Sequence, residues 1–496
     1  GMNRMDKKNG LVRFVLTIIL CAILAAVALV AIAVVVALIF YRGEGGEVEP
    51  ALAVVEEISD GASSIDEPYA EVSDQTSGQT PEPIPEPTPT PTARLAFVGD
   101  IMCHSTQLDA ARIAPGEYDF NYKFRYIAPY LQAADFAIGN LETTLVRERY
   151  AGWPLFRSPA SLAEALVNAG FDMVTTGNNH SFDALVPGVR STMEILDEVG
   201  LAWTGTYLTP ECREEISVFE VNGFTFAIVN MTMHVNALET HMYDHMYMVK
   251  IIYLDLVEQA TIDYEMIRET MARARALETD FIIASPHIGI EYYGTMNRQG
   301  AGHRNDTFDR TDGRWINWIR TLELFLDEGA DMVMNHHPHT LLPAEFVYVS
   351  DGDLTRRAFV AYSLANFVSG QRTQPRETTA VFYVDVTRDE YGNAYISAAS
   401  YVPVWVRQTD PTRAPLQDFT ILPVVETLNR VEREGDTPDL RPQDIERMRE
   451  VHRDVTHMLS GEPIALYDMA YEYPITRSRM REEFPGLPLW GTLPWQ

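Results

Sequence analysis

Short apolar runs alternate with amphipathic stretches of helical period through residues 94–337. The apolar runs predict β-strands at 94–99, 134–140, 171–177, 280–287 and 330–337. The amphipathic stretches predict helices at 159–170, 187–200, 254–278 and 315–329. Gly170 and Gly200 end two of these stretches and are predicted C-caps. Residues 216–230 predict a β-hairpin, because Asn222-Gly223 suits a two-residue turn.

The pattern changes in the later part of the chain. Apolar runs at 344–349, 357–368 and 378–387 predict strands with few helices between them. Residues 420–460 are charged and predicted to be helical, and 467–496 are rich in aromatic residues and Pro, which indicates a packed irregular tail. Alternating strands and helices followed by a β-rich part favour a layered α/β sandwich over an eight-fold barrel, which needs helices throughout.

A long apolar run lies near the start of the chain. Residues 14–40 carry no charged side chain, and a helix that spans a bilayer needs about 20 such residues. Basic residues precede the run and acidic residues follow it: Arg4, Lys7, Lys8 and Arg13, then Glu44, Glu47 and Glu49. The positive-inside rule then predicts a cytoplasmic segment at 1–13, a single transmembrane anchor at 14–41 and an extracellular body on the cell membrane. A cleaved signal peptide is the alternative.

The segment after the anchor, residues 42–93, is acidic and then rich in Pro and Thr. This composition cannot bury a core and favours extended backbone, so we predict a linker. A folded domain is predicted at 94–410, followed by a helical and then aromatic and Pro-rich extension at 411–496.

Charge and cysteine content narrow the function classes. The formal net charge is −31, which argues against a nucleic-acid partner, because such binding needs clustered Lys and Arg. The three cysteines, Cys21, Cys103 and Cys212, lack the spacing of a zinc site. We predict that Cys103 and Cys212 are free thiols and not a disulfide.

Residue types that bind metals follow five predicted strands in turn. They are Asp100; Glu142; Asn179, His180 and Asp183; His287 and Glu291; and His336, His337 and His339. Ligands bind at the carboxyl ends of strands in α/β sheets, so we expect these side chains to converge. Carboxylate, amide and imidazole groups together suit one or two divalent ions such as Mn, Zn or Fe. The set contains no cysteine, which argues against a structural thiolate zinc site.

The order of these motifs resembles the calcineurin-like metallophosphoesterase superfamily and, within it, the CapA (poly-γ-glutamate capsule synthesis) family. The matching stretches are GDIM (99–102), NLETTL (140–145), GNNHSFD (177–183), PHIGIEY (286–292), HHPH (336–339) and YSLANF (362–367). The resemblance covers about residues 94–370. It implies a four-layer α/β-β/α sandwich of the metallophosphoesterase type, preceded by one transmembrane helix, in a bacterial envelope protein.

The resemblance also implies roles within the site. The expected metal ligands are Asp100, Glu142, Asn179, His287, His337 and His339. His180 is expected to be the catalytic acid, and Asp183 is expected to orient it. A divalent ion held by such a set lowers the pKa of a water molecule to about 7, which suits hydrolysis of phosphoester or amide bonds.

The first motif departs from the superfamily pattern. Asp-x-His is expected, but Ile101 and Met102 follow Asp100, and the nearest imidazole is that of His104. Glu142 stands where the superfamily has a bridging Asp. A single-metal site is one expectation, and a two-metal site completed by His104 or Glu291 is the other. His336 is a further candidate ligand.

The family resemblance implies hydrolysis, transfer or export of a γ-glutamyl polymer, with the envelope polymer or other capsule-assembly membrane proteins as partners. A non-catalytic envelope scaffold and a metal-dependent amidohydrolase barrel are the alternatives. A chain of charge −31 repels a free polyanion. Either the cleft is locally basic or the substrate is not a free polyanion, and the arginines that could make it basic are Arg147, Arg149, Arg157, Arg298 and Arg304.

Overall fold

The computed structural model describes most of the predicted folded domain and parts of the C-terminal extension. The described residues are 91–252, 262–292, 306–309, 314–351, 354–371, 374–408, 419–435, 440–461, 464 and 471–481. Within these ranges no helix is both long enough and apolar enough to cross a membrane. The predicted anchor at 14–41, nearly all of the linker, Arg298 and Arg304 lie outside the described residues.

The first large sheet has nine strands and is mixed. Its parallel part consists of β1 (Thr92–Ile101), β4 (Phe136–Leu141), β7 (Met173–Thr175) and β8 (Ala202–Thr204). Its antiparallel part consists of β18 (Thr378–Arg388), β19 (Ala394–Arg407) and β20 (Thr420–Pro423), with β18 next to β1. Two short strands complete it: β17 (Asn366–Val368) beside β1 and β21 (Tyr473–Pro474) beside β19.

The second large sheet has seven strands and is also mixed. Its order is β22 (Ser478–Met480), β15 (Ala344–Asp351), β16 (Leu354–Ala361), β14 (Met332–Met334), β11 (Phe281–His287), β10 (Phe224–Thr232) and β9 (Ser217–Val221). Three two-stranded sheets are separate from both large sheets: β2 (Arg112–Ala114) with β3 (Glu117–Tyr118), β5 (Thr144–Leu145) with β6 (Arg157–Ser158), and β12 (Asp306–Asp309) with β13 (Arg314–Asn317). Both large sheets are open, so the amidohydrolase-barrel alternative is wrong.

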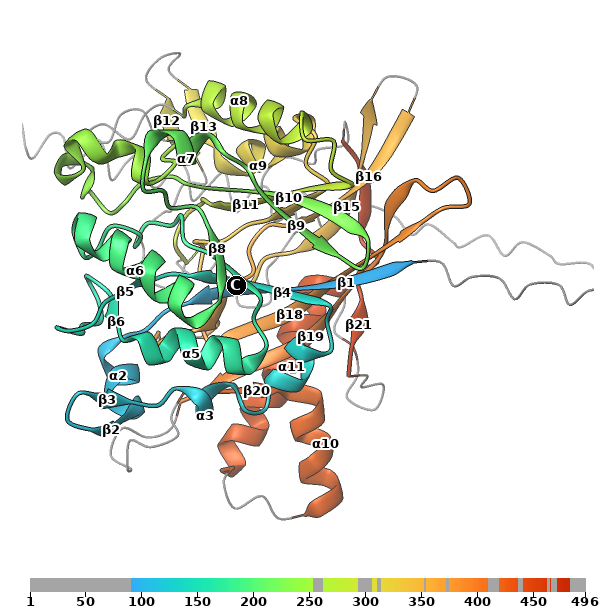
Figure 1. The fold of residues 1–496 in the computed structure, drawn as a ribbon. Coiled ribbons are helices and arrows are strands. Elements are labelled where there is room, and N and C mark those ends of the chain that lie inside the picture. The colour runs from blue at the N-terminus through green and yellow to red at the C-terminus, as the bar shows by residue number, and fades with distance from the viewer. Residues whose placement is uncertain are drawn as a thin grey trace, which may run out of the picture. The chain divides into compact units, whose positions relative to one another are not determined.

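The two large sheets face each other and bury a shared apolar core (Figure 1). Phe136 of the first sheet stacks on Phe219 of the second, with ring centroids 4.3 Å apart. In β1, Leu95 and Phe97 belong to this shared core, while Ala96 and Val98 belong to a second core on the opposite face. The alternation follows from the period of two in a strand, and it explains why β1 is apolar on both faces.

Helices cover the outer faces of both sheets (Figure 1). The first sheet is covered by α3 (Asn121–Phe124), α4 (Ala128–Gln132), α5 (Ala160–Ala169) and α6 (Leu185–Val199). The second is covered by α8 (Tyr264–Arg275) and α9 (Trp318–Asp327). Helices α10 (Val424–Glu434) and α11 (Pro442–Ser460) pack on β19. Short helical segments lie in the connections: α2 (Ser105–Ala111), α7 (Pro210–Glu214), η1 (Glu239–His241) and η2 (Tyr243–Met248).

Several local predictions are confirmed. Gly170 and Gly200 end their helices with φ of 98° and 74°, a left-handed conformation that glycine adopts without a Cβ clash. Asn222 and Gly223 turn the β9–β10 hairpin with φ of 50° and 80°. Cys103 and Cys212 are free thiols, as predicted.

Several elements were predicted wrongly. Of the helix predicted at 254–278, the described part begins only at Tyr264, and the tail predicted to be irregular contributes strands β21 and β22. The helix predicted at 315–329 begins at Trp318, because Arg314–Asn317 form β13 and pair with β12. The strand predicted at 357–368 is interrupted between β16 and β17, where Ala365 has a φ of 62°. The helical region predicted at 420–460 starts with strand β20, which pairs with β19.

Candidate metal centre

The carboxyl ends of strands from both sheets meet at one place. Asp100 lies near the end of β1, in register with Asn140 of β4 on one side and with Asn366 of β17 on the other. His287 ends β11 and forms an isolated parallel bridge with His336, just after β14. Parallel strands present their last residues at one edge, so residues far apart in sequence become neighbours here.

Asp100 is completely buried and lies among nitrogen atoms. Its Oδ1 accepts a hydrogen bond of 2.8 Å from the Asn140 amide and lies 3.3 Å from His336 Nδ1. Its Oδ2 lies 3.0 Å from His339 Nδ1. Burial raises the pKa of Asp100, but the nearby imidazoles of His336 and His339 outweigh burial, and the pKa falls well below its usual range. Asp100 is therefore an anion at neutral pH.

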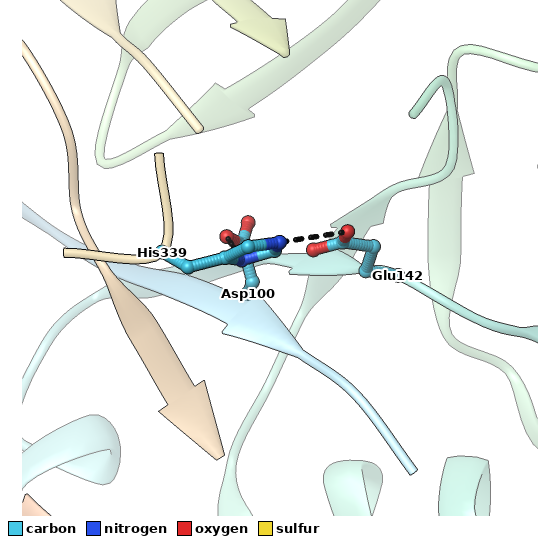
Figure 2. A group of neighbouring side chains, drawn as sticks. All are labelled: Asp100, Glu142 and His339. Atoms are coloured by element: carbon cyan, nitrogen blue, oxygen red, sulfur yellow. Dashed lines mark hydrogen bonds and ion pairs between the residues drawn. The ribbon is translucent and has the colours of Figure 1, made fainter. Parts of the chain in front are cut away.

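Glu142 is also completely buried, but its surroundings are different. Neither of its carboxyl oxygens has a hydrogen-bond partner. Its Oε1 lies 3.7 Å from His339 Nε2 (Figure 2). The same oxygen lies 3.7 Å from His287 Nε2. Burial raises the pKa of Glu142 well above its usual range, and the negative charge of Asp100 raises it further.

Asp100, Glu142 and His339 offer one ligand atom each, and these atoms lie within 4.8 Å of one another. Figure 2 shows the His339 ring between the two carboxylates. An ionised carboxylate is costly to bury unless it is paired or coordinates a metal. A divalent cation would satisfy the two oxygens of Glu142, so the residues present fit a metal ion.

Two further imidazoles line the same space. His287 Nε2 lies 2.8 Å from the Asn179 amide oxygen and 3.1 Å from His337 Nδ1, and its Nδ1 lies 3.2 Å from the Asn140 amide nitrogen. Burial lowers the pKa values of His287 and His337 well below the usual range. Both rings are therefore neutral, which is the form that binds metals.

The backbone of the His-Pro-His segment is unusual. His337 and His339 have φ values of 91° and 57°, a region that residues other than glycine seldom adopt and that often marks functional sites. These angles flank Pro338, whose carbonyl accepts a hydrogen bond of 2.7 Å from the Tyr292 backbone N–H.

His180 forms a separate unit with Asp183 at the edge of the cluster. His180 Nδ1 lies 2.7 Å from Asp183 Oδ2, which also accepts a 2.6 Å hydrogen bond from the Phe156 backbone N–H. The Phe156 ring packs edge-on against the imidazole at 4.6 Å. The Asn236 amide nitrogen lies 3.4 Å from both ring nitrogens of His180. Asp183 thus fixes the orientation of His180 through Nδ1, while Nε2 contacts Asn236.

The structure brings most predicted site residues together. Those in the cluster are Asp100, Glu142, Asn179, His180, Asp183, His287, His336, His337 and His339. His104 stands apart: its Nδ1 accepts a 3.0 Å hydrogen bond from the Gly370 N–H, and its ring packs on Phe156 at 4.9 Å. Glu291 is half-buried nearby, and its charge contributes to the raised pKa of Glu142.

Asn140 and Asn236 are cluster residues that were not predicted as site residues. Asn140, not Glu142, lies directly beside Asp100 in the sheet, and it contacts both Asp100 and His287. Its place at the end of an apolar strand, two residues before Glu142, was a usable signal. Asn236 lies in the segment between β10 and η1, and nothing in its local sequence indicates a site.

Sequence comparison decides the family. The chain matches the model of the family described as "Bacterial capsule synthesis protein PGA_cap" over residues 94–303 and 317–371, more than half of its 496 residues. The chain belongs to this family. The predicted resemblance to CapA proteins is thereby confirmed.

Two curated relatives of the PGA_cap chain are bacilli proteins. "Capsule biosynthesis protein CapA" of Bacillus anthracis is 22% identical over 302 residues, covering 58% of this chain and 63% of that protein. "PGA biosynthesis protein CapA" of Bacillus subtilis (strain 168) is 26% identical over 294 residues, covering 58% and 66%. The chain spans less than two thirds of either relative. Among solved structures, a purple acid phosphatase from yellow lupin (Lupinus luteus) seeds matches with 11% sequence identity, covering 68% of this chain and 55% of that chain. The TM-score is 0.26, which is too low to support a conclusion about this chain.

Proposed function

We propose that this PGA_cap chain is a membrane-anchored envelope protein that acts in poly-γ-glutamate or capsule polymer synthesis, export or attachment. We further propose that it is a metal-dependent hydrolase or transferase on a four-layer sandwich of the metallophosphoesterase type. Family membership supports the first part. The observation that carries the second is the buried Asp100, Glu142 and His339 cluster, in which Glu142 has no hydrogen-bond partner.

The side chains that would hold the ion are Asp100, Glu142, Asn179, His287, His337 and His339. A divalent Mn, Zn or Fe ion supplies Lewis acidity and lowers the pKa of a water molecule to about 7. The neutral imidazoles of His287 and His337 and the ionised Asp100 are in the protonation states that this requires. Glu142, whose pKa is raised by burial, would lose its proton on binding the cation.

His180 is the proton donor in this proposal. Asp183 accepts a hydrogen bond from the Nδ1–H of His180 and holds one ring orientation, with 2.7 Å between the two atoms. Nε2 then carries the proton that passes to the leaving group. The buried Phe156 ring packs against the imidazole and shields it from bulk water.

The test uses the full-length chain, purified in detergent. Metal content is measured after dialysis, and hydrolysis is measured with a generic phosphodiester and with a γ-glutamyl peptide. We expect one or two divalent ions per chain and turnover of at least one substrate that chelation abolishes. A chain that binds no divalent ion and hydrolyses neither substrate contradicts the proposal.

A non-catalytic scaffold is the second candidate function. It is favoured by the first motif, where buried Met102 occupies the position at which the superfamily has a His ligand. A metal-free, inactive chain that still binds polymer would establish the scaffold.

A further inference from the structure

A cavity of about 510 Å³ is lined by chain neighbours of Phe156 and Asp183. Residues that follow β5 form one wall, and the start of α6 forms the other. Two of its lining residues, Arg157 and Ala184, are the chain neighbours of Phe156 and Asp183, which hold His180. The cavity is therefore adjacent to the proposed proton donor, and its volume is that of an ordinary ligand site.

Three arginines line this cavity in a strongly acidic protein. They are Arg147, Arg149 and Arg157. Arg147 pairs with Glu198 at 2.5 Å and Arg149 with Glu148 at 3.3 Å, but all four side chains are more than half exposed. Exposed pairs of this kind contribute little free energy and separate readily when another anion binds.

Arg157 is the least satisfied of the three. Its side chain makes no hydrogen bond or ion pair with any described residue, and its Nε is buried without a partner. A half-buried guanidinium beside a cavity is a strong anion ligand, because its planar donors match both oxygens of a carboxylate. Arg157 sits on β6, so the backbone pairing of β5 and β6 fixes where it lies.

The remaining polar residues of the cavity favour one kind of anion. Glu148, Glu194 and Ser191 lie in the same lining and accept hydrogen bonds. Two carboxylates there disfavour a doubly charged phosphate. Donors and acceptors together suit a chain that alternates single carboxylates with amide N–H groups.

We propose that this cavity binds the free carboxylates of a γ-linked glutamate chain next to the metal centre, with Arg157 as the main contact and Arg147 and Arg149 in support. The substrate assignment rests on the function proposed above. The three arginines offset the charges of Glu148, Glu194 and Glu198, so this region is less acidic than the protein as a whole. Short contacts to Arg157 then act against a repulsion between net charges that salt screens.

The test measures binding and not turnover. A fluorescent γ-linked glutamate oligomer is titrated against the full-length chain in detergent. We expect Arg157→Gln to weaken binding by about tenfold or more, because hydrogen bonds between charged groups are lost. Arg157→Lys keeps the charge without the paired donors, so we expect an intermediate affinity. Arg449→Gln removes an exposed arginine on α11, paired with Glu446, and is expected to leave affinity unchanged.

Three outcomes would overturn the subsite. The first is an Arg157→Gln variant that binds the oligomer with wild-type affinity, and the second is an oligomer of methyl esters that binds as tightly as the free carboxylates. The third is inorganic phosphate that competes for the site more strongly than glutamate oligomers do. Metal content and phosphodiester hydrolysis are measured on the same preparations. If the wild-type chain holds no metal and hydrolyses no phosphodiester but still binds the oligomer through Arg157, only the proposed enzyme is contradicted. If the wild-type chain hydrolyses the phosphodiester but binds the oligomer equally well without Arg157, only the subsite is contradicted. If Arg157→Gln does not fold, as judged by circular dichroism, the Arg157→Lys affinity decides.

Discussion

Glu142 is the residue whose surroundings are hardest to reconcile with a purely structural role. It is fully buried, neither oxygen accepts a hydrogen bond, and the neighbouring Asp100 is anionic. A buried carboxylate without donors costs several kcal/mol unless it is neutralised or bound to a cation. The His287 imidazole, 3.7 Å away, is neutral because burial lowers its pKa, so it supplies little positive charge to Glu142. A bound divalent cation would satisfy both oxygens of Glu142.

A ligand and a proton donor in this cluster should fail differently when each is removed. His339→Ala removes an imidazole between two carboxylates, so we expect both metal content and activity to fall. His180→Ala removes the proposed donor but no ligand, so we expect metal content to persist while turnover falls by about 10²–10⁴-fold. Metal analysis and hydrolysis assays on both variants make the comparison.

His457→Ala serves as the control, because His457 lies in the last turn of α11, an element distant in sequence from the cluster. It should retain both metal and activity. Should His180→Ala lose metal as completely as His339→Ala, His180 is a ligand and the division of roles is wrong.

Site residues could be predicted from sequence when they stand at or shortly after the end of a strand. Site residues in other loops could not. Asp100 and His287 stand at strand ends and Glu142 directly follows β4, so topology alone brings these three together. His339 follows β14 by five residues, and its position also depends on the loop that contains Pro338. Asn236 reaches His180 from a segment with positive φ at Asn236 and Ala237. Nothing in local composition predicts where such a loop lies, because its position depends on the packing of β10 and the segments around it.

Elements were predicted well where one periodicity dominated, as in helices α5 and α6 with their glycine caps. Predictions failed where pairing with a distant strand overrode the local pattern. Arg314–Asn317 continue an apolar helical stripe, yet they pair with Asp306–Asp309. The short strand β17 pairs with β1, with Asp100 in register with Asn366. This pairing joins residues more than 260 positions apart, so the local sequence does not indicate it.

Helix α11 contains a buried histidine, and the protonation of this histidine makes the stability of the fold depend on pH. His452 is completely buried, and its Nε2 lies 2.8 Å from the Tyr473 hydroxyl of β21, while Nδ1 has no partner. Burial lowers the pKa of His452 to about 4, below an unfolded value of about 6.5. The unfolded chain therefore takes up the proton first, so this contribution to stability is complete above about pH 6.5 and is lost as the pH falls towards 4.

We expect His452→Gln to reduce the acid sensitivity of the fold. Gln retains a donor for the Tyr473 hydroxyl but does not titrate, so between pH 7 and 5 wild type should lose up to about 2 kcal/mol relative to the variant. Denaturant unfolding of both proteins at pH 7 and pH 5 measures their free energies of unfolding. Subtracting the values of the variant from those of wild type cancels the contributions of the other histidines. His457→Gln on the same helix is the control, and identical pH dependence in wild type and His452→Gln would contradict the argument.

At the scale of the whole molecule, charge is distributed unevenly along the chain. The net charge is −31, yet four basic residues precede the uncharged run at 14–40 and only one, Arg42, closely follows it. The run is long enough to span a bilayer, and orientation follows the side that holds the Lys and Arg residues. The acidic body is then expected outside the cell, where the proposed polymer lies.

Protease added to intact cells that produce the full-length chain tests this orientation. We expect the folded body to be released, because the linker at 42–93 is rich in Pro, Thr and acidic residues and offers extended backbone to cleavage. Replacing Arg4, Lys7, Lys8 and Arg13 by Gln removes the orienting charge, so a fraction of chains should insert in reverse and become protected. Cells lysed before digestion provide the control for linker accessibility. A body protected in intact cells but cleaved after lysis would place it in the cytoplasm, and a body recovered from the medium without protease would indicate a cleaved signal peptide instead of an anchor.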